Sequence, residues 1–157
     1  MSSDSSKTAE IIAPPPLLYL TALTIGLVFQ ALLPQPILSS APLSQGIGVL
    51  LFVLGGLLTR WSFITMRRVG TSGNPRKTST ALATSGPFRI SRNPIYLAMT
   101  GMYLGISFFI NSAWSLVLLV PLLFVMHWGV IFREERYLAK QFGQEYLEYK
   151  SMVRRWL

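Results

Sequence analysis

The stretch Ser85–Gly105, SGPFRISRNPIYLAMTGMYLG, decides how this chain is organised, because it joins a basic, irregular segment to an apolar one. The change comes at Asn93-Pro94. Asn is a favoured N-cap and Pro suits the first helical position, so a helix is predicted to begin at Pro94. The positive end of that helix would lie beside Arg89 and Arg92. Together these features predict a site for an anionic group.

Polar side chains continue from this junction into the apolar helix. Four of them, spaced i, i+3, i+7 and i+10, fall on one helical face: Asn93, Tyr96, Thr100 and Tyr103. A polar stripe in an apolar helix is expected to face protein or a cavity rather than lipid. The alternative interpretation needs no site: Tyr96 would be an interfacial residue, and Gly101-xxx-Gly105 would serve ordinary helix packing.

The composition is that of a membrane protein rather than of a soluble domain. Of the 157 residues 51% are hydrophobic and 13% are charged, yet the net charge is +8. The basic residues lie in two blocks between apolar runs, which favours a membrane surface over nucleic acid as the partner. The chain has no Cys and one His, so neither a disulfide nor a metal site is expected.

The sequence predicts an all-α membrane protein with four transmembrane helices and a C-terminal amphipathic interfacial helix. The four apolar runs that we expect to span the membrane cover about residues 17–33, 45–66, 94–110 and 113–131. Residues 1–16 are rich in Ser and end in three prolines, so we predict a disordered tail there. Residues 17–157 are then a single domain.

The basic residues also predict the topology. The loop 67–93 and the C-terminal segment 132–157 carry twelve of the fourteen Lys and Arg residues. Four spans with both termini in the cytoplasm place both of these segments inside, which is the side that Lys and Arg prefer.

The C-terminal segment has a helical pattern of its own. Five apolar residues would share one face of a helix: Phe142, Tyr146, Tyr149, Val153 and Trp156. Such a helix is expected to lie in the membrane interface, with Lys150, Arg154 and Arg155 near lipid phosphates. Gly143 is the position at which it would break.

Two carboxylates follow directly on the fourth apolar run. The spacing of His127, Glu134 and Glu135 predicts that His127 and at least Glu134 point to the same side. Carboxylates beside a membrane need partners, and four arginines are candidates: Arg89, Arg92, Arg133 and Arg136. Such a cluster could be a set of ion pairs that fastens the tail to the loop. It could also be a pocket for a zwitterionic ligand.

Several short motifs, in this order and spacing, resemble the integral-membrane methyltransferases. They are GPF-RISRNPIY, NPIYLAMTGMYLG, the Glu-Glu pair and FGQEYLEYK, and the resemblance covers roughly residues 69–155. The family includes isoprenylcysteine carboxyl methyltransferase and phosphatidylethanolamine N-methyltransferase, so the resemblance implies S-adenosyl-L-methionine as cofactor. The family's cofactor-site motifs carry over to Arg92, Asn93, Pro94, Tyr96, Glu134 and Glu135. Isoprenylcysteine enzymes usually have His where this chain has Asn93.

The expected activity is methyl transfer to a lipophilic acceptor, most closely like isoprenylcysteine carboxyl O-methylation. Phospholipid N-methylation and small-thiol S-methylation are the alternatives. Arg89 and Thr100 join the residues expected at the cofactor, and Arg92, Glu134, Glu135 and His127 those expected in catalysis. An amine acceptor must lose a proton, which His127 or a carboxylate could take. A different class of function is a non-catalytic scaffold that binds anionic lipid or a partner helix.

Overall fold

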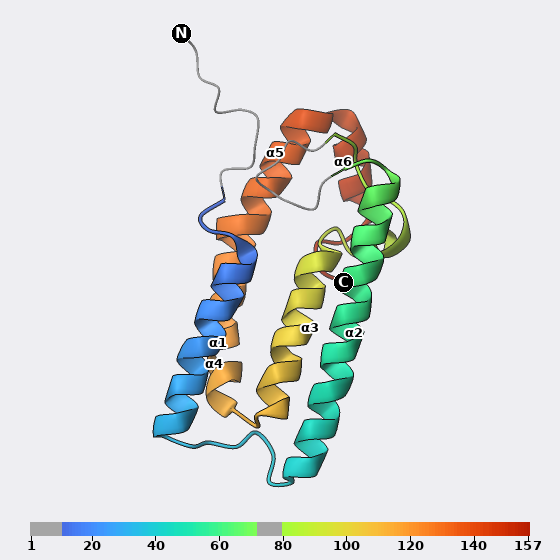
Figure 1. Ribbon diagram of the computed structural model, residues 1–157. Helices are drawn as coiled ribbons and strands as arrows, with labels where there is room; N and C mark the ends of the chain where they lie inside the picture. Colours follow the sequence, from blue (N-terminus) through green and yellow to red (C-terminus); the bar gives the residue numbers. More distant parts are fainter. Residues whose placement is uncertain (1–10, 72–79) are drawn as a thin grey trace.

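The computed structural model describes residues 11–71 and 80–157, and in these two ranges it is all-helical, with no strand. Its long helical segments, four in the described ranges, run side by side (Figure 1). They are α1 (Pro15–Leu32), α2 (Ala41–Arg68), α3 (Pro94–Phe109) and a continuous fourth segment made of α4 (Ala113–Val125), the π-helix η2 (Met126–Ile131) and α5 (Phe132–Phe142). The short elements are the 3-10 helix η1 (Gly86–Arg89) and the final helix α6 (Gln144–Met152).

The predicted apolar runs all form helices, with different ends. Pro15 and Pro16, which we predicted in the tail, are the first residues of α1. The second helix is longer than the predicted 45–66 at both ends. Most of the predicted tail, residues 1–10, lies outside the described residues, as do Arg76 and Lys77 of the basic loop.

In the described ranges, three helical segments are long and apolar enough to cross a membrane: α1, α2 and the continuous segment Ala113–Phe142. Helix α3 has only 16 residues. At 1.5 Å per residue it is about 24 Å long, less than the roughly 30 Å of a hydrocarbon core. A fourth span therefore stays a prediction. In Figure 1 the upper end of α3 lies below the upper ends of α2 and α5.

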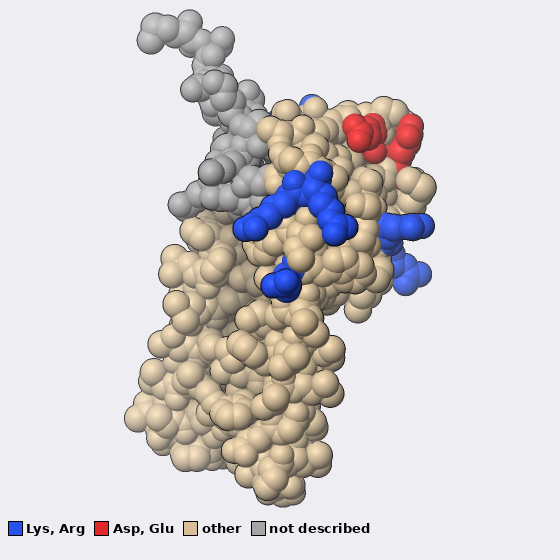
Figure 2. Space-filling model, turned by 45° about the vertical axis from the view of Figure 1, so that its right-hand side comes forward, with Lys and Arg blue, Asp and Glu red and all other residues tan. Residues whose placement is uncertain are grey.

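The two ends of the bundle differ in character. The turns at residues 33–40 and 110–112 close its lower end, while η1, α6, the C-terminus and the first described residues lie in its upper half (Figure 1). On the face that Figure 2 shows, the charged side chains all lie in the upper part, and the lower part has none. This distribution agrees with a membrane-embedded lower part and a polar upper end.

Small residues set the position of α3 against α2. A Cβ atom added at Gly105 would lie 2.7 Å from the backbone nitrogen of Phe52, and one added at Gly48 would lie 2.5 Å from that of Phe109. Real Cβ atoms do not come this close, so glycine is required at both positions. The glycine packing predicted from the sequence is thus present, and it coexists with the polar stripe of α3 on another side.

The predicted fourth span ends at about residue 131, but the helix that contains it does not end there. It continues through η2 to Phe142, and in η2 the Phe132 N–H binds the carbonyl of His127, five residues earlier. The helix ends at Gly143, whose φ of 55° costs a glycine little. Gly143 is indeed a break, and α6 begins directly after it.

The predicted interfacial helix is wrong in form. Helix α6 ends at Met152, so Val153 and Trp156 lie beyond it. Tyr146 is 1% exposed and packs with Tyr149 against Ala83 and Phe88 of the loop before α3. The Tyr149 hydroxyl donates to the Phe88 carbonyl at 2.7 Å. The aromatic side chains are therefore covered by the protein's own loop.

Candidate functional site

The N-terminal end of α3 is the centre of the candidate site. The helix begins at Pro94, as predicted, and Asn93 occupies the N-cap position. The Asn93 side chain makes no capping hydrogen bond, so that part of the prediction is wrong. Its Nδ2 donates instead to the carbonyl of Arg155 at 3.0 Å. Ser91 Oγ accepts the Asn93 backbone N–H at 3.1 Å.

Arg92 is buried beside this helix end, with its side chain only 9% exposed. Its Nη2 lies 3.3 Å from Glu135 Oε1. Within the described part of the chain, Nε and Nη1 are buried and have no hydrogen-bond partner. A buried donor without a partner costs about 1–3 kcal/mol. An anionic ligand that accepted hydrogen bonds from these two nitrogens would remove that cost. Arg89, by contrast, is exposed at the end of η1.

Glu135 is a buried carboxylate held between cations, and its side chain is 5% exposed. Arg155 donates to both of its oxygens, from Nε at 2.8 Å and from Nη2 at 2.6 Å. Lys150 Nζ lies 3.8 Å from Oε2. The hydrogen bonds to Glu135 raise the pKa of Arg155. Arg92 was among the predicted partners of the carboxylates, but Arg155 was predicted at lipid phosphates and is ion-paired instead.

His127 joins this cluster through Arg155, whose Nη1 lies 2.6 Å from His127 Nε2. A guanidinium can only donate, so Nε2 accepts and the ring proton lies on Nδ1. We predicted His127 on the same side as at least Glu134, and the structure connects it, through Arg155, to Glu135. Because the π-helix η2 takes up one extra residue, the directions of Glu134 and Glu135 relative to His127 differ from those in a regular α-helix.

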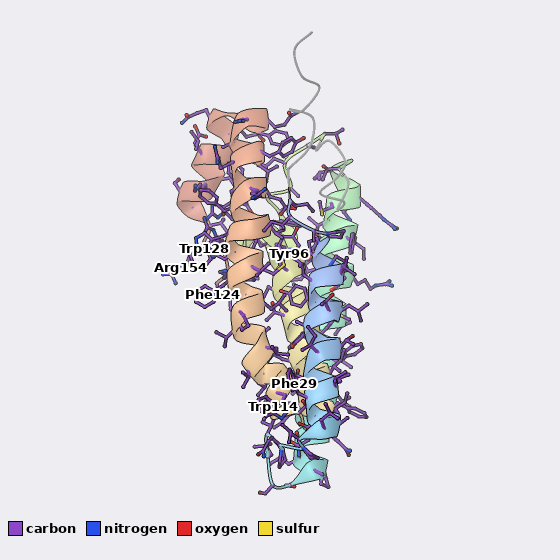
Figure 3. The ribbon with its side chains drawn as sticks, turned by 90° about the vertical axis from the view of Figure 1, so that its left-hand side faces the viewer. Phe29, Tyr96, Trp114, Phe124, Trp128 and Arg154 are labelled. Carbon is purple, nitrogen blue, oxygen red and sulfur yellow. The ribbon has the colours of Figure 1, made fainter. Side chains whose placement is uncertain are left out.

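Glu134 has a different environment. The Tyr96 hydroxyl donates to Glu134 Oε1 at 2.7 Å. In the described ranges Glu134 forms no ion pair, so its negative charge is not neutralised locally. Figure 3 shows Tyr96 in the interior of the bundle, whereas Phe124, Trp128 and Arg154 lie at its outer edge. The structure thus places Glu134 and Glu135 in two separate sets of contacts.

The polar stripe of α3 faces protein, as predicted. Thr100 donates to the Tyr96 carbonyl at 2.9 Å and shares a 2.7 Å hydrogen bond with the hydroxyl of Tyr19. Tyr103 donates to the Ser115 carbonyl at 2.8 Å. Tyr19, on α1, did not appear among the predicted site residues, because nothing in the pattern of residues 17–33 distinguishes it.

Tyr146 is a buried residue whose hydroxyl is influenced by the charges of Glu135, Arg92 and Arg155. Burial, assisted by the charge of Glu135, raises the pKa of the Tyr146 hydroxyl to about 12 although Arg92 and Arg155 act in the opposite direction. The phenol is therefore neutral at physiological pH. The site then combines a buried cation with spare donors, at Arg92, and a carboxylate without a counter-ion among the described residues, at Glu134. The first of these groups can bind an anion, and the second can bind a cationic group.

Comparison with known proteins adds a family. Residues 43–145 match the family described as phospholipid methyltransferase. A protein of Haemophilus influenzae, described as uncharacterized, is 33% identical over 63 residues, which are 40% of this chain and all of that relative. The matched family region contains Arg92, Tyr96, His127 and the Glu134-Glu135 pair. It ends before Arg155.

Proposed function

The chain belongs to the phospholipid methyltransferase family, and we propose that it transfers a methyl group from S-adenosyl-L-methionine to a lipophilic acceptor in the bilayer. The observation that carries the proposal is the Arg92 guanidinium at the N-terminus of α3, two of whose nitrogens are buried and have no partner among the described residues. Bound there, S-adenosyl-L-methionine would supply an electrophilic methyl group and a carboxylate. That carboxylate suits the unpartnered donors of Arg92 and the positive end of the helix.

The other residues of the site support this arrangement. Glu135 lies 3.3 Å from Nη2 of Arg92, and Nε and Nη1 have no partner among the described residues and are left for a ligand. Asn93 and Pro94 fix the first turn of α3. The Thr100 hydroxyl, one turn further along the helix, donates to the backbone carbonyl of Tyr96. Tyr96 in turn orients the carboxylate of Glu134. Rigid positioning of this kind is a main source of acceleration in group transfer.

We propose a phospholipid amine as the acceptor. Glu134 lacks a cationic partner in the described residues, so it can attract an ammonium group and take its proton. His127 is less suited to this role because Arg155 occupies its Nε2. The same Glu134 charge would repel a carboxylate acceptor. The isoprenylcysteine carboxylate expected from the sequence, and a small thiol, are therefore the alternatives.

The position of α3 would let one ligand reach the site from water and another from the bilayer. Its N-terminus lies below the upper ends of α2 and α5 (Figure 1), at the end of the bundle that carries the charged residues (Figure 2). We propose that this end faces the cytoplasm, from which the water-soluble cofactor enters. The lipophilic acceptor would arrive laterally from the bilayer.

Calorimetry with S-adenosyl-L-methionine and S-adenosylhomocysteine, in detergent and in nanodiscs, tests the cofactor. Binding is expected, and its absence in both media would overturn the proposal. Lipid binding without cofactor binding would instead support the non-catalytic scaffold.

Methyl-labelled cofactor tests the acceptor, in membranes that contain the protein. A phospholipid N-methyl label survives alkaline hydrolysis, whereas a methyl ester releases labelled methanol. Volatile label would support the carboxylate alternative, and label in a thioether would support the thiol.

A further inference from the structure

The last residues of the chain lie across the N-terminal end of α3. The Arg92 backbone N–H donates to the carbonyl of Arg154 at 3.0 Å. Ser91 Oγ and Asn93 Nδ2 both donate to the carbonyl of Arg155, at 3.2 and 3.0 Å. Trp156 packs against the hydrophobic cluster that includes Tyr96. The backbone at Arg155 is therefore held in place by the same segment that presents Arg92.

Two arginines compete for one buried carboxylate. Arg155 has a forked pair with both oxygens of Glu135, at 2.6 and 2.8 Å, while Arg92 makes one longer contact of 3.3 Å to Oε1. The forked geometry is the stronger one. Arg155 occupies both oxygens of Glu135, and that carboxylate makes only one longer contact to Arg92 instead of a second fork. The Nε and Nη1 atoms of Arg92 stay without a partner among the described residues.

We propose that Arg155 is a positioning residue that keeps Arg92 available for the anionic group of the ligand. Without Arg155, the buried charge of Glu135 would draw the Arg92 guanidinium into a forked pair. Ligand binding would then require that pair to break. This inference rests on the proposed function, because it concerns the affinity of the same cofactor site.

The test is calorimetric titration of S-adenosylhomocysteine into the full-length chain in nanodiscs. Arg155→Ala should weaken binding about tenfold or more. Glu135→Gln in the same chain should restore affinity to within about threefold of wild type, because no buried carboxylate then competes for Arg92. Arg154→Ala, which removes an exposed guanidinium from the neighbouring residue, is the matched control and should change affinity less than about twofold.

A diffuse loss of positive charge would also weaken binding, so a second control is needed. Lys150→Ala removes a cation 3.8 Å from the same carboxylate, and affinity should stay within about twofold of wild type. The loss in Arg155→Ala should also persist when NaCl is raised from about 0.1 to about 0.5 M, since salt screens a diffuse field.

The outcomes separate the two proposals. No binding by the wild type overturns the proposed function, and this inference with it. Binding by the wild type with equal affinity in Arg155→Ala overturns the inference alone, as does a double variant that stays as weak as Arg155→Ala. If Arg155→Ala fails to fold, Arg155→Lys replaces it, because an ammonium cannot form the fork. It should lose part of the affinity and regain it with Glu135→Gln, and full affinity in Arg155→Lys overturns the inference.

Discussion

Arg155 donates to both carboxylate oxygens of Glu135, at 2.8 and 2.6 Å, and so ties the end of the chain to the fourth long helix. The pair is buried at Glu135, which is 5% exposed, and partly open at Arg155, which is 22% exposed. It lies directly beside Arg92. The methyltransferase site that we propose therefore includes the C-terminal segment as well as the helices of the bundle.

Arg92→Ala should lower the affinity for S-adenosylhomocysteine tenfold to a hundredfold. A charge-assisted hydrogen bond contributes about 1.5–3 kcal/mol, and this variant removes the donors that we assign to the carboxylate. Arg92→Lys should recover only part of the loss, because an ammonium lacks the planar fork. Calorimetry in nanodiscs measures both. Arg89→Ala is the control, since Arg89 is exposed. Equal losses at the two arginines would show that diffuse potential holds the ligand.

Glu134→Gln should lower kcat about 10²- to 10⁴-fold with an amine acceptor, which is the usual range for removal of a general base. Cofactor affinity should change much less. Tyr96→Phe removes the hydroxyl that orients Glu134 and should lower kcat by a smaller factor. Tyr103→Phe is its matched control, because that hydroxyl binds the Ser115 carbonyl elsewhere on α3. Unchanged turnover in Glu134→Gln would contradict the assigned role.

Gly105→Ala should lower the free energy of unfolding by about 1–3 kcal/mol, the usual cost of overpacking. The added Cβ would lie 2.7 Å from the Phe52 nitrogen and push α3 away from α2. Gly56→Ala, with nothing within 4 Å of the added Cβ, should be neutral or stabilising by up to about 1 kcal/mol. Thermal unfolding in detergent measures the difference. Similar unfolding temperatures for the two variants would mean that the α2–α3 contact is looser than described.

Gly143→Ala should detach the C-terminal segment without a steric clash. No atom lies within 4 Å of the added Cβ, but φ is +55° and ψ is −125°, a backbone conformation that costs a residue with a Cβ about 1–3 kcal/mol. Hydrogen exchange should therefore quicken at the Arg92 amide, which donates to the Arg154 carbonyl. Exchange in the lower half of α1 should not change. Uniform quickening along the chain would point to global destabilisation instead.

Much of the bundle could be predicted because its signals are local. Asn93-Pro94 predicts the start of α3 through the backbone preferences of two adjacent residues. The apolar runs predict helices because their length and composition suffice, although the fourth run continues further than its hydropathy indicates. The polar stripe of α3 predicts a protein-facing side, since lipid cannot satisfy hydroxyl groups.

Family motifs predicted which residues gather at the site, but not how they pair. Short motifs identify Arg92, Glu134 and Glu135. The partner of each residue depends on the direction, or azimuth, in which its side chain points around the helix axis. One π turn at residues 126–131 changes that azimuth, and nothing in the local hydrophobic pattern marks where it occurs.

The sequence by itself therefore determined an all-helical membrane bundle, the beginning of α3 at Pro94 and the charged residues at one of its ends. Tertiary structure alone decided that Arg155 neutralises Glu135, that Tyr19 reaches Thr100, and that Tyr146 is buried under the loop before α3. The physical reason is separation along the chain. These contacts join residues 20 to 81 positions apart, so they follow from how whole helices pack and where the chain turns back, not from the preferences of neighbouring residues.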